Sequence, residues 1–120
     1  MLRIRKTQMT ALASVLAEGF ADRAAAFLAA TFPAKAAGLE PTELSALVGA
    51  GIARAAAAGI ETEQDVVRFL ALELIAGPDL ADAPWAAPLL AEPMPAEAKL
   101  SRLYAQARRH GFTVRAALQP

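Results

Sequence analysis

The chain has 120 residues, enough for one domain with a single hydrophobic core, and we expect that domain to span residues 1–120. Its hydrophobic fraction of 56% is too high for a disordered chain, and the absence of cysteine excludes disulfides, thiolate catalysis and cysteine-ligated metals. The formal net charge of zero argues against a nucleic-acid-binding protein, and the lack of cysteine fits a reducing compartment, so we expect a cytoplasmic protein.

The charges are distributed unevenly along the sequence. Residues 1–6 carry three basic side chains and residues 99–120 carry five, and neither end carries an acid. Between these ends, all 12 acidic residues face only four basic ones. This segregation has two interpretations. Either both ends fold over an acidic body, or a bipolar surface steers a charged partner toward the protein.

The first predicted helix runs from an N-cap at Thr7 to about Ala30. Acidic residues interrupt its apolar run, so we do not expect a signal peptide here. The helix should end at Phe32-Pro33, because proline disfavours helical geometry in the residue before it, and a short turn should follow over 33–37. Apolar residues recur at spacings of three and four on one face, which we expect to turn toward the core: Met9, Leu12, Leu16, Phe20, Ala24, Phe27 and Leu28.

A second helix is predicted from Pro41 to about Ala58, because proline suits the first turn of a helix and a glycine follows the expected end. Gly49 and Gly51 lie inside this helix, where each glycine costs about 1 kcal/mol relative to alanine. We expect close approach of another helix to offset this cost, with Gly51 and Ala55 forming the contact groove.

A third helix is predicted over residues 63–76. Thr62, followed three residues later by Asp65, is a short-chain variant of the capping box. From Val66 to Ile75 only two side chains are polar, and a helix that is apolar on nearly all sides lies at the centre of a fold or meets another chain. A glycine–proline–aspartate sequence then ends the helix.

A proline-rich loop is predicted over residues 80–95, with at most one helical turn around residues 86–91. Trp85, the only tryptophan, should anchor this loop by plugging the bundle. The last helix should run from about residue 96 to Arg109, with Gly111 as its stop. We therefore predict an all-α, single-domain bundle of about five helices with a proline-rich loop before the last helix, and no membrane span.

The sequence lacks the groups that catalysis needs. His110, the only histidine, is explained as a partner of the helix dipole, and no serine lies in a Gly-x-Ser-x-Gly turn. The paired acids Asp79 and Asp82 lack the alternating pattern of a calcium loop. We expect no enzyme activity, no cofactor and no metal, and we assign the clustered acids to helix capping and solvation: Glu61, Glu63, Asp65 and Glu73.

Basic residues gather on the last helix. Arg102 and Arg109 are seven residues apart and so share one helix face, with Arg108 and Arg115 nearby in sequence. A phosphate-binding surface is one interpretation, but the acidic body and the sequence pI of 6.6 argue against nucleic acid as the partner.

Short motifs along most of the chain resemble a family of short, uncharacterised bacterial proteins that are often encoded beside type VI secretion or polymorphic-toxin genes. The resemblance implies an accessory role, such as an effector adaptor or chaperone. One departure from the pattern is Leu80, where an aromatic residue is expected. The matching residues are Gln8-Met9, Phe32-Pro33, Gly51-Ile52-Ala53-Arg54, 59–63, Asp65-Val66, Arg68-Phe69-Leu70, Gly77-Pro78-Asp79, Pro84-Trp85-Ala86 and 100–104.

Together, the apolar third helix, the tryptophan loop, the segregated charge and the resemblance predict a non-enzymatic protein-interaction module. The leading hypothesis is a cytoplasmic adaptor or chaperone for a secreted toxin or its carrier. The predicted partner contacts are apolar at Trp85, Leu89 and Leu90 and charged at Arg102 and Arg109. The alternatives are an immunity-type inhibitor that blocks a toxin's active site and a structural homo-oligomer, such as a homodimer, joined through the helix over 63–76.

Overall fold

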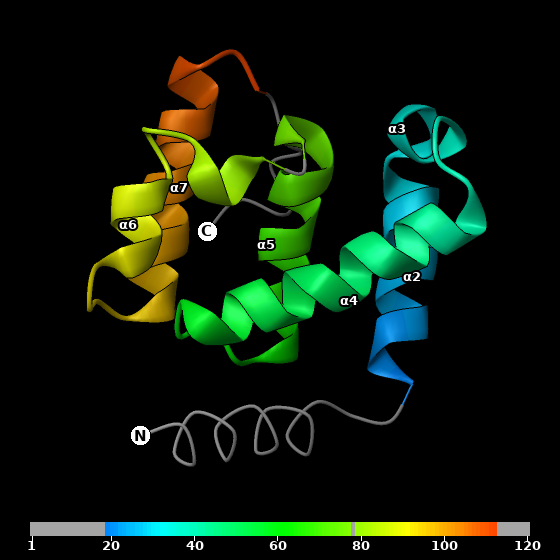
Figure 1. Cartoon of the computed structure of the whole chain (residues 1–120), viewed down its shortest axis with the longest axis horizontal. Helices are drawn as coiled ribbons and strands as arrows, with labels where there is room; N and C mark the ends of the chain where they lie inside the picture. Colours follow the sequence, from blue (N-terminus) through cyan, green and yellow to red (C-terminus); the bar gives the residue numbers. More distant parts are fainter. Residues whose placement is uncertain (1–18, 78, 113–120) are drawn as a thin grey trace.

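The computed structural model describes residues 19–77 and 79–112, and in this part of the chain every regular element is helical (Figure 1). The all-α prediction is confirmed there. Among the described residues there are six α-helices rather than about five. The segment predicted as a turn over 33–37 is a short helix, and the helical turn expected around 86–91 forms another; each has proline in its first turn, where it fits. The elements are α2 (Phe20–Thr31), α3 (Pro33–Ala37), α4 (Pro41–Ala57), α5 (Glu63–Ala76), the 3-10 helix η1 (Leu80–Asp82), α6 (Ala87–Ala91) and α7 (Ala96–Arg109).

The first predicted helix is interrupted at Gly19. This residue has φ +81°, a left-handed conformation through which an α-helix does not continue, and α2 begins at Phe20. The prediction of one unbroken helix from Thr7 is therefore wrong at Gly19, while Thr7 itself and Met9, Leu12 and Leu16 lie outside the described residues. On α2 the predicted core face is confirmed for Phe20, Ala24 and Leu28, which are buried.

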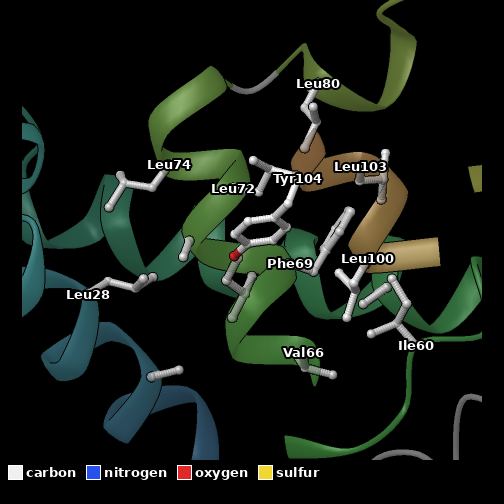
Figure 2. Close-up of a cluster of buried hydrophobic side chains, with 14 of the residues drawn as sticks. Leu28, Ile60, Val66, Phe69, Leu72, Leu74, Leu80, Leu100, Leu103 and Tyr104 are labelled. Carbon is white, nitrogen blue, oxygen red and sulfur yellow. The ribbon is translucent and has the colours of Figure 1, made fainter. Parts of the chain in front are cut away.

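Helix α5 lies at the centre of the fold. Seven of its residues are buried, and the helix packs against α2, α4 and α7. Figure 2 shows its Phe69 and Leu72 beside Leu100 and Tyr104 of α7, with Ile60 and Leu80 from the connecting segments in the same cluster. Burying each such side chain contributes about 1.5–3 kcal/mol to the free energy of folding. The central position predicted for the helix over 63–76 is thus confirmed.

Helices α4 and α5 cross in close contact at Gly51. A Cβ atom at this position would lie 2.6 Å from Oε1 of Glu73 and would also overlap Cδ2 of Leu70. Ala55, one turn later, is fully buried, so the predicted contact groove is present. The same prediction is wrong for Gly49, where an added Cβ would meet nothing within 4 Å.

Helices α4 and α7 end in the same way, with a left-handed glycine that reverses the chain. After α4, the Ile60 N–H donates to the Ala55 carbonyl with an N···O distance of 2.8 Å, and Gly59 has φ +82°. After α7, the Phe112 N–H donates to the Ala107 carbonyl at 2.9 Å, and Gly111 has φ +87°. Both ends are Schellman motifs, which turn the next apolar side chain back toward the helices.

Candidate functional site

Trp85 attaches the loop before α6 to the end of α7. Its half-buried indole ring stacks on the imidazole of His110, with ring centroids 5.1 Å apart and planes inclined by 18°. Phe112 lies on the same cluster, with its centroid 6.2 Å from that of the indole. Trp85 therefore anchors the loop as predicted, but it does so at the carboxyl end of α7 and not as a plug in the middle of the bundle.

Leu89 and Leu90 belong to α6, which lies beside α7 (Figure 1). Both side chains are half-buried and pack against the hydrophobic core, so part of their apolar surface is already used within the chain. Trp85, Leu89 and Leu90 therefore lie on one continuous segment, 85–90, alongside α7.

Arg102 and Arg109 are exposed on α7, away from its buried stripe. Arg109 directly precedes His110, so the stack on His110 brings Trp85 and Arg109 to the same end of α7. Among the described residues, neither Arg102 nor Arg109 makes an ion pair. Of the five predicted contacts, Trp85 and Arg109 thus lie at the same end of α7. Arg102 lies two helical turns before Arg109 on the same helix.

Three ion pairs among the described residues join members of the acidic middle of the sequence to one another. Arg23 binds Glu63 with an N···O distance of 3.2 Å, and Arg68 binds Asp65 at 3.5 Å. These three pairs lie within residues 23–73, so none of the three joins a basic end of the sequence to the acidic body. Residues 1–6 and Arg115 lie outside the described residues.

In the third ion pair the carboxylate is buried and the guanidinium is partly exposed. Glu73, at 0% exposure, accepts hydrogen bonds from Arg54, with distances of 2.5 Å from Nε to Oε2 and 3.0 Å from Nη2 to Oε1. The bond to Glu73 raises the pKa of the Arg54 guanidinium, against the opposing effect of burial. The expectation that Glu73 is solvated is therefore wrong. Its position among apolar residues of a central helix was a signal that it needs a buried cationic partner.

Lys99 belongs to the basic end of the sequence, but its side chain turns inward and is only 3% exposed. The ammonium donates to the carbonyl of Ala58 at 2.7 Å and to that of Leu90 at 2.9 Å. Burial lowers the pKa of this ammonium, and the nearby Glu92 carboxylate partly opposes that change. One side chain of α7 thus binds the carboxyl ends of both α4 and α6.

Between α2 and α5 lies an apolar hollow of about 350 Å³, which we call the α2–α5 groove. Phe27 stands in it with 40% of its surface exposed, as the one large hydrophobic residue so exposed in the part of the chain that the structure describes. The prediction that Phe27 faces the core is wrong, because α4 and α5 cover the neighbouring stripe of α2 and leave this edge open. The lining residues are Phe20, Arg23, Ala24, Phe27, Glu63, Gln64, Val67 and Arg68.

A second hollow, of about 280 Å³, lies where the carboxyl end of α4 meets η1 and α6, and we call it the α4–α6 pocket. Its lining is almost entirely aliphatic, with Arg54 as the one charged member: Arg54, Ala57, Ala58, Ala81, Ala87, Leu90 and Ala91. Of the five predicted contacts, only Leu90 lines this pocket. Sequence reasoning missed it because its walls come from three segments.

Two classes of site find no counterpart in residues 19–77 and 79–112. No group of three or more His, Cys, Asp or Glu side chains there could hold a metal ion, and no helix there is long and apolar enough to cross a membrane. No family model, curated protein or solved structure matches the chain.

Proposed function

We propose that the chain is a non-enzymatic protein-interaction module, an adaptor or chaperone that binds a segment of a secreted toxin or of its carrier. The observation that carries this proposal is the α2–α5 groove with Phe27 exposed in it. An aromatic side chain left open in a hollow whose surface is mostly apolar is a usual anchor point for an apolar side chain of a partner.

The rim of the groove suits an amphipathic helix. The Arg23–Glu63 pair joins α2 to α5 across the rim, and Arg68 lies next to Val67 on the α5 side. A partner helix would place its apolar face over Phe27 and Val67 and its polar face toward these charges. Binding in this way does not require another exposed face of α5. This matters because Gln64 is the one exposed residue of α5, the others being buried or half-buried.

The end of α7 offers a second surface for the same partner. Trp85 and Arg109 combine an aromatic ring with a guanidinium, two groups that are enriched at the energetic centres of protein interfaces. We keep Trp85, Leu89, Leu90, Arg102 and Arg109 as proposed contacts, and we rank them below the α2–α5 groove because the leucines pack partly against the core.

The test is affinity capture of partners from the native cells, identified by mass spectrometry at low and moderate salt. We expect one dominant secretion-associated protein, and we expect Phe27→Ala to reduce its recovery about tenfold, in line with the loss of an interface anchor. Ala26→Ser, exposed on the same helix and outside the groove, is the matched control. Equal recovery with Phe27→Ala would exclude the groove, and Trp85→Ala with Arg109→Ala would then test the second surface.

Two alternatives have their own readouts. An immunity-type inhibitor would bind the catalytic domain of a toxin with nanomolar affinity and abolish its activity, whereas an adaptor or chaperone would bind a non-catalytic segment and increase its solubility. A structural homo-oligomer would change its sedimentation coefficient between two protein concentrations and would be captured without a second protein.

A further inference from the structure

The α4–α6 pocket combines aliphatic walls with a single cationic group. Five alanines and Leu90 form the walls, and the side chain of Arg54 completes the lining. At about 280 Å³ the pocket lies just below the range of sites for drug-sized molecules, so its size suits a short aliphatic chain. Its chemistry differs from that of the α2–α5 groove, which is lined by aromatic rings and rimmed by paired charges.

Arg54 is held in place with hydrogen-bonding capacity to spare. Its Nε and Nη2 atoms bind the buried Glu73 carboxylate, its sole hydrogen-bond partner among the described residues. A guanidinium carries five N–H donors, so the hydrogen bonds to Glu73 leave some donors of Arg54 unused. The Arg54 side chain is 34% exposed. Because Glu73 already fixes the guanidinium, a second anion would lose little affinity to ordering of that side chain.

Lys99 removes an obstacle to an anion in this pocket. The carbonyls of Ala58 and Leu90, which are both pocket residues, lie at the negative ends of α4 and α6 and would repel a carboxylate. The Lys99 ammonium binds both of these carbonyls from the protein side. Lys99 does not itself line the pocket, but its buried positive charge offsets the negative ends of the two helices that do.

We propose that the α4–α6 pocket binds an aliphatic carboxylate, with the hydrocarbon against the alanines and Leu90 and the carboxylate accepting hydrogen bonds from Arg54. This chemistry is shared by a free branched-chain acid and by the carboxyl-terminal residue of a polypeptide. The proposal is independent of the α2–α5 groove, so the failure of one leaves the other standing.

Asp82 supplies an internal check on the charge of the ligand. It lies close enough to Arg54 to help raise the pKa of the guanidinium, and it belongs to η1, whose Ala81 lines the pocket. Its carboxylate repels a bound anion and has no such effect on a neutral ligand. Replacing Asp82 with asparagine should therefore tighten the binding of an acid and leave the binding of the matching amide unchanged.

The experiment is a nuclear magnetic resonance titration of the full chain with isocaproate and with isocaproamide, observed at the alanine methyl groups. We expect isocaproate to shift the methyl signals of Ala57, Ala81, Ala87 and Ala91 and to bind about tenfold more tightly than the amide, because it alone makes charge-assisted hydrogen bonds. Ala57→Leu should fill the pocket and weaken binding about tenfold. Ala50→Leu, exposed on the same helix and outside the pocket lining, is the matched control.

A double variant isolates the guanidinium without leaving Glu73 unpaired in the core. Arg54→Met with Glu73→Met removes the whole pair, a change that folded proteins commonly tolerate. In this variant isocaproate and isocaproamide should bind equally. Equal binding of the two probes to the unaltered protein, or unchanged binding in Ala57→Leu, would overturn the proposal.

The source of the carboxylate is decided with a short peptide that ends in leucine, compared with its carboxyl-terminal amide. Tighter binding of the peptide acid than of isocaproate would assign the pocket to the end of a polypeptide. Binding no tighter than that of isocaproate would assign it to a small acid. If neither the peptide acid nor isocaproate binds better than its amide, the pocket does not recognise carboxylates.

Discussion

The carboxylate of Glu73 on α5 is bound at both of its oxygens by Arg54 of α4, at the crossing where Gly51 of α4 leaves no room for a side chain. A Cβ atom at position 51 would lie 2.6 Å from the same Glu73 Oε1 that Arg54 Nη2 binds. The close approach of the two helices and the buried ion pair are therefore parts of one contact, and a change in either must disturb the other.

Removing one partner of this pair should be far more harmful than removing both. Arg54→Met leaves an uncompensated carboxylate in the core and should lower the free energy of unfolding by about 3–5 kcal/mol. Arg54→Met with Glu73→Met should restore most of that loss, since apolar side chains then fill the site. Urea unfolding of the three proteins measures this directly. Equal stability of the single and double variants would contradict the assignment of a buried Glu73 carboxylate that needs Arg54 as its partner.

The two glycines of α4 should respond in opposite directions to alanine. Gly51→Ala inserts a methyl group against Leu70 and Glu73, both fully buried, and should destabilise the fold by about 1–3 kcal/mol in spite of the better helix propensity. Gly49→Ala has open space around its Cβ and should stabilise by about 0.5–1 kcal/mol. Thermal unfolding of both variants provides the comparison, and a destabilising Gly49→Ala would show that the two sites are not distinguished by packing.

Tyr104 gives the fold a defined response to alkaline pH. Its hydroxyl on α7 donates to the carbonyl of Arg68 on α5, with an O···O distance of 2.5 Å, and burial raises the pKa of this hydroxyl against the smaller, opposing effect of the Arg68 charge. Between its ordinary pKa of about 10 and the raised value, tyrosine ionises in the unfolded chain and stays protonated in the folded one. The stabilising contribution is therefore complete below about pH 10 and is lost as the pH rises above it.

The check is urea unfolding of the wild type and of Tyr104→Phe between neutral pH and about pH 11, a window that includes the ordinary tyrosine pKa. At neutral pH the wild type should be more stable by about 1 kcal/mol, the value of one hydrogen bond. Above about pH 10 this advantage should shrink by up to about 1.4 kcal/mol per pH unit. Titration of other groups is common to both proteins and cancels in the difference, so a constant gap would contradict the prediction.

Lys99→Met should loosen α6 selectively. The change leaves the carbonyls of Ala58 and Leu90 without their donor, and hydrogen bonds to a charged group are worth about 1.5–3 kcal/mol each. Hydrogen exchange of the α6 amides should accelerate more than that of the central helix α5. Arg102→Met, exposed on the same helix, should leave the exchange of α6 unchanged. Equal acceleration in both helices would mean that Lys99 supports the whole fold and not the attachment of α6.

Most helix ends could be predicted from residues close to them in the sequence. Thr62 was recognised as a cap from its own sequence neighbourhood, and its Oγ1 accepts from the Asp65 N–H at 3.2 Å. Gly59 and Gly111 likewise end α4 and α7 through hydrogen bonds that reach only five residues back. By contrast, Gly19 could have continued a helix or broken it, and its neighbours contain no sign of which.

Pairings between distant segments were beyond the reach of the sequence. Arg54 and Glu73 are 19 residues apart, and their hydrogen bonds follow from the crossing of two helices and not from any local motif. The stack of Trp85 on His110 likewise needs α6 to lie along α7 before the two rings can meet. The sequence did not predict the α2–α5 groove. Helical spacing places Phe27 on the apolar face of its helix, but it does not indicate how much of that face α4 and α5 cover.

The two acceptors that Lys99 uses are main-chain carbonyls, and every amino acid supplies one. Substitutions at positions 58 and 90 can therefore alter the neighbouring surface without removing the hydrogen bonds that join α4, α6 and α7. Among side chains, these two hydrogen bonds therefore depend on residue 99 alone. A substitution at position 58 or 90 can thus change the packing of the α4–α6 pocket while the two hydrogen bonds from Lys99 remain.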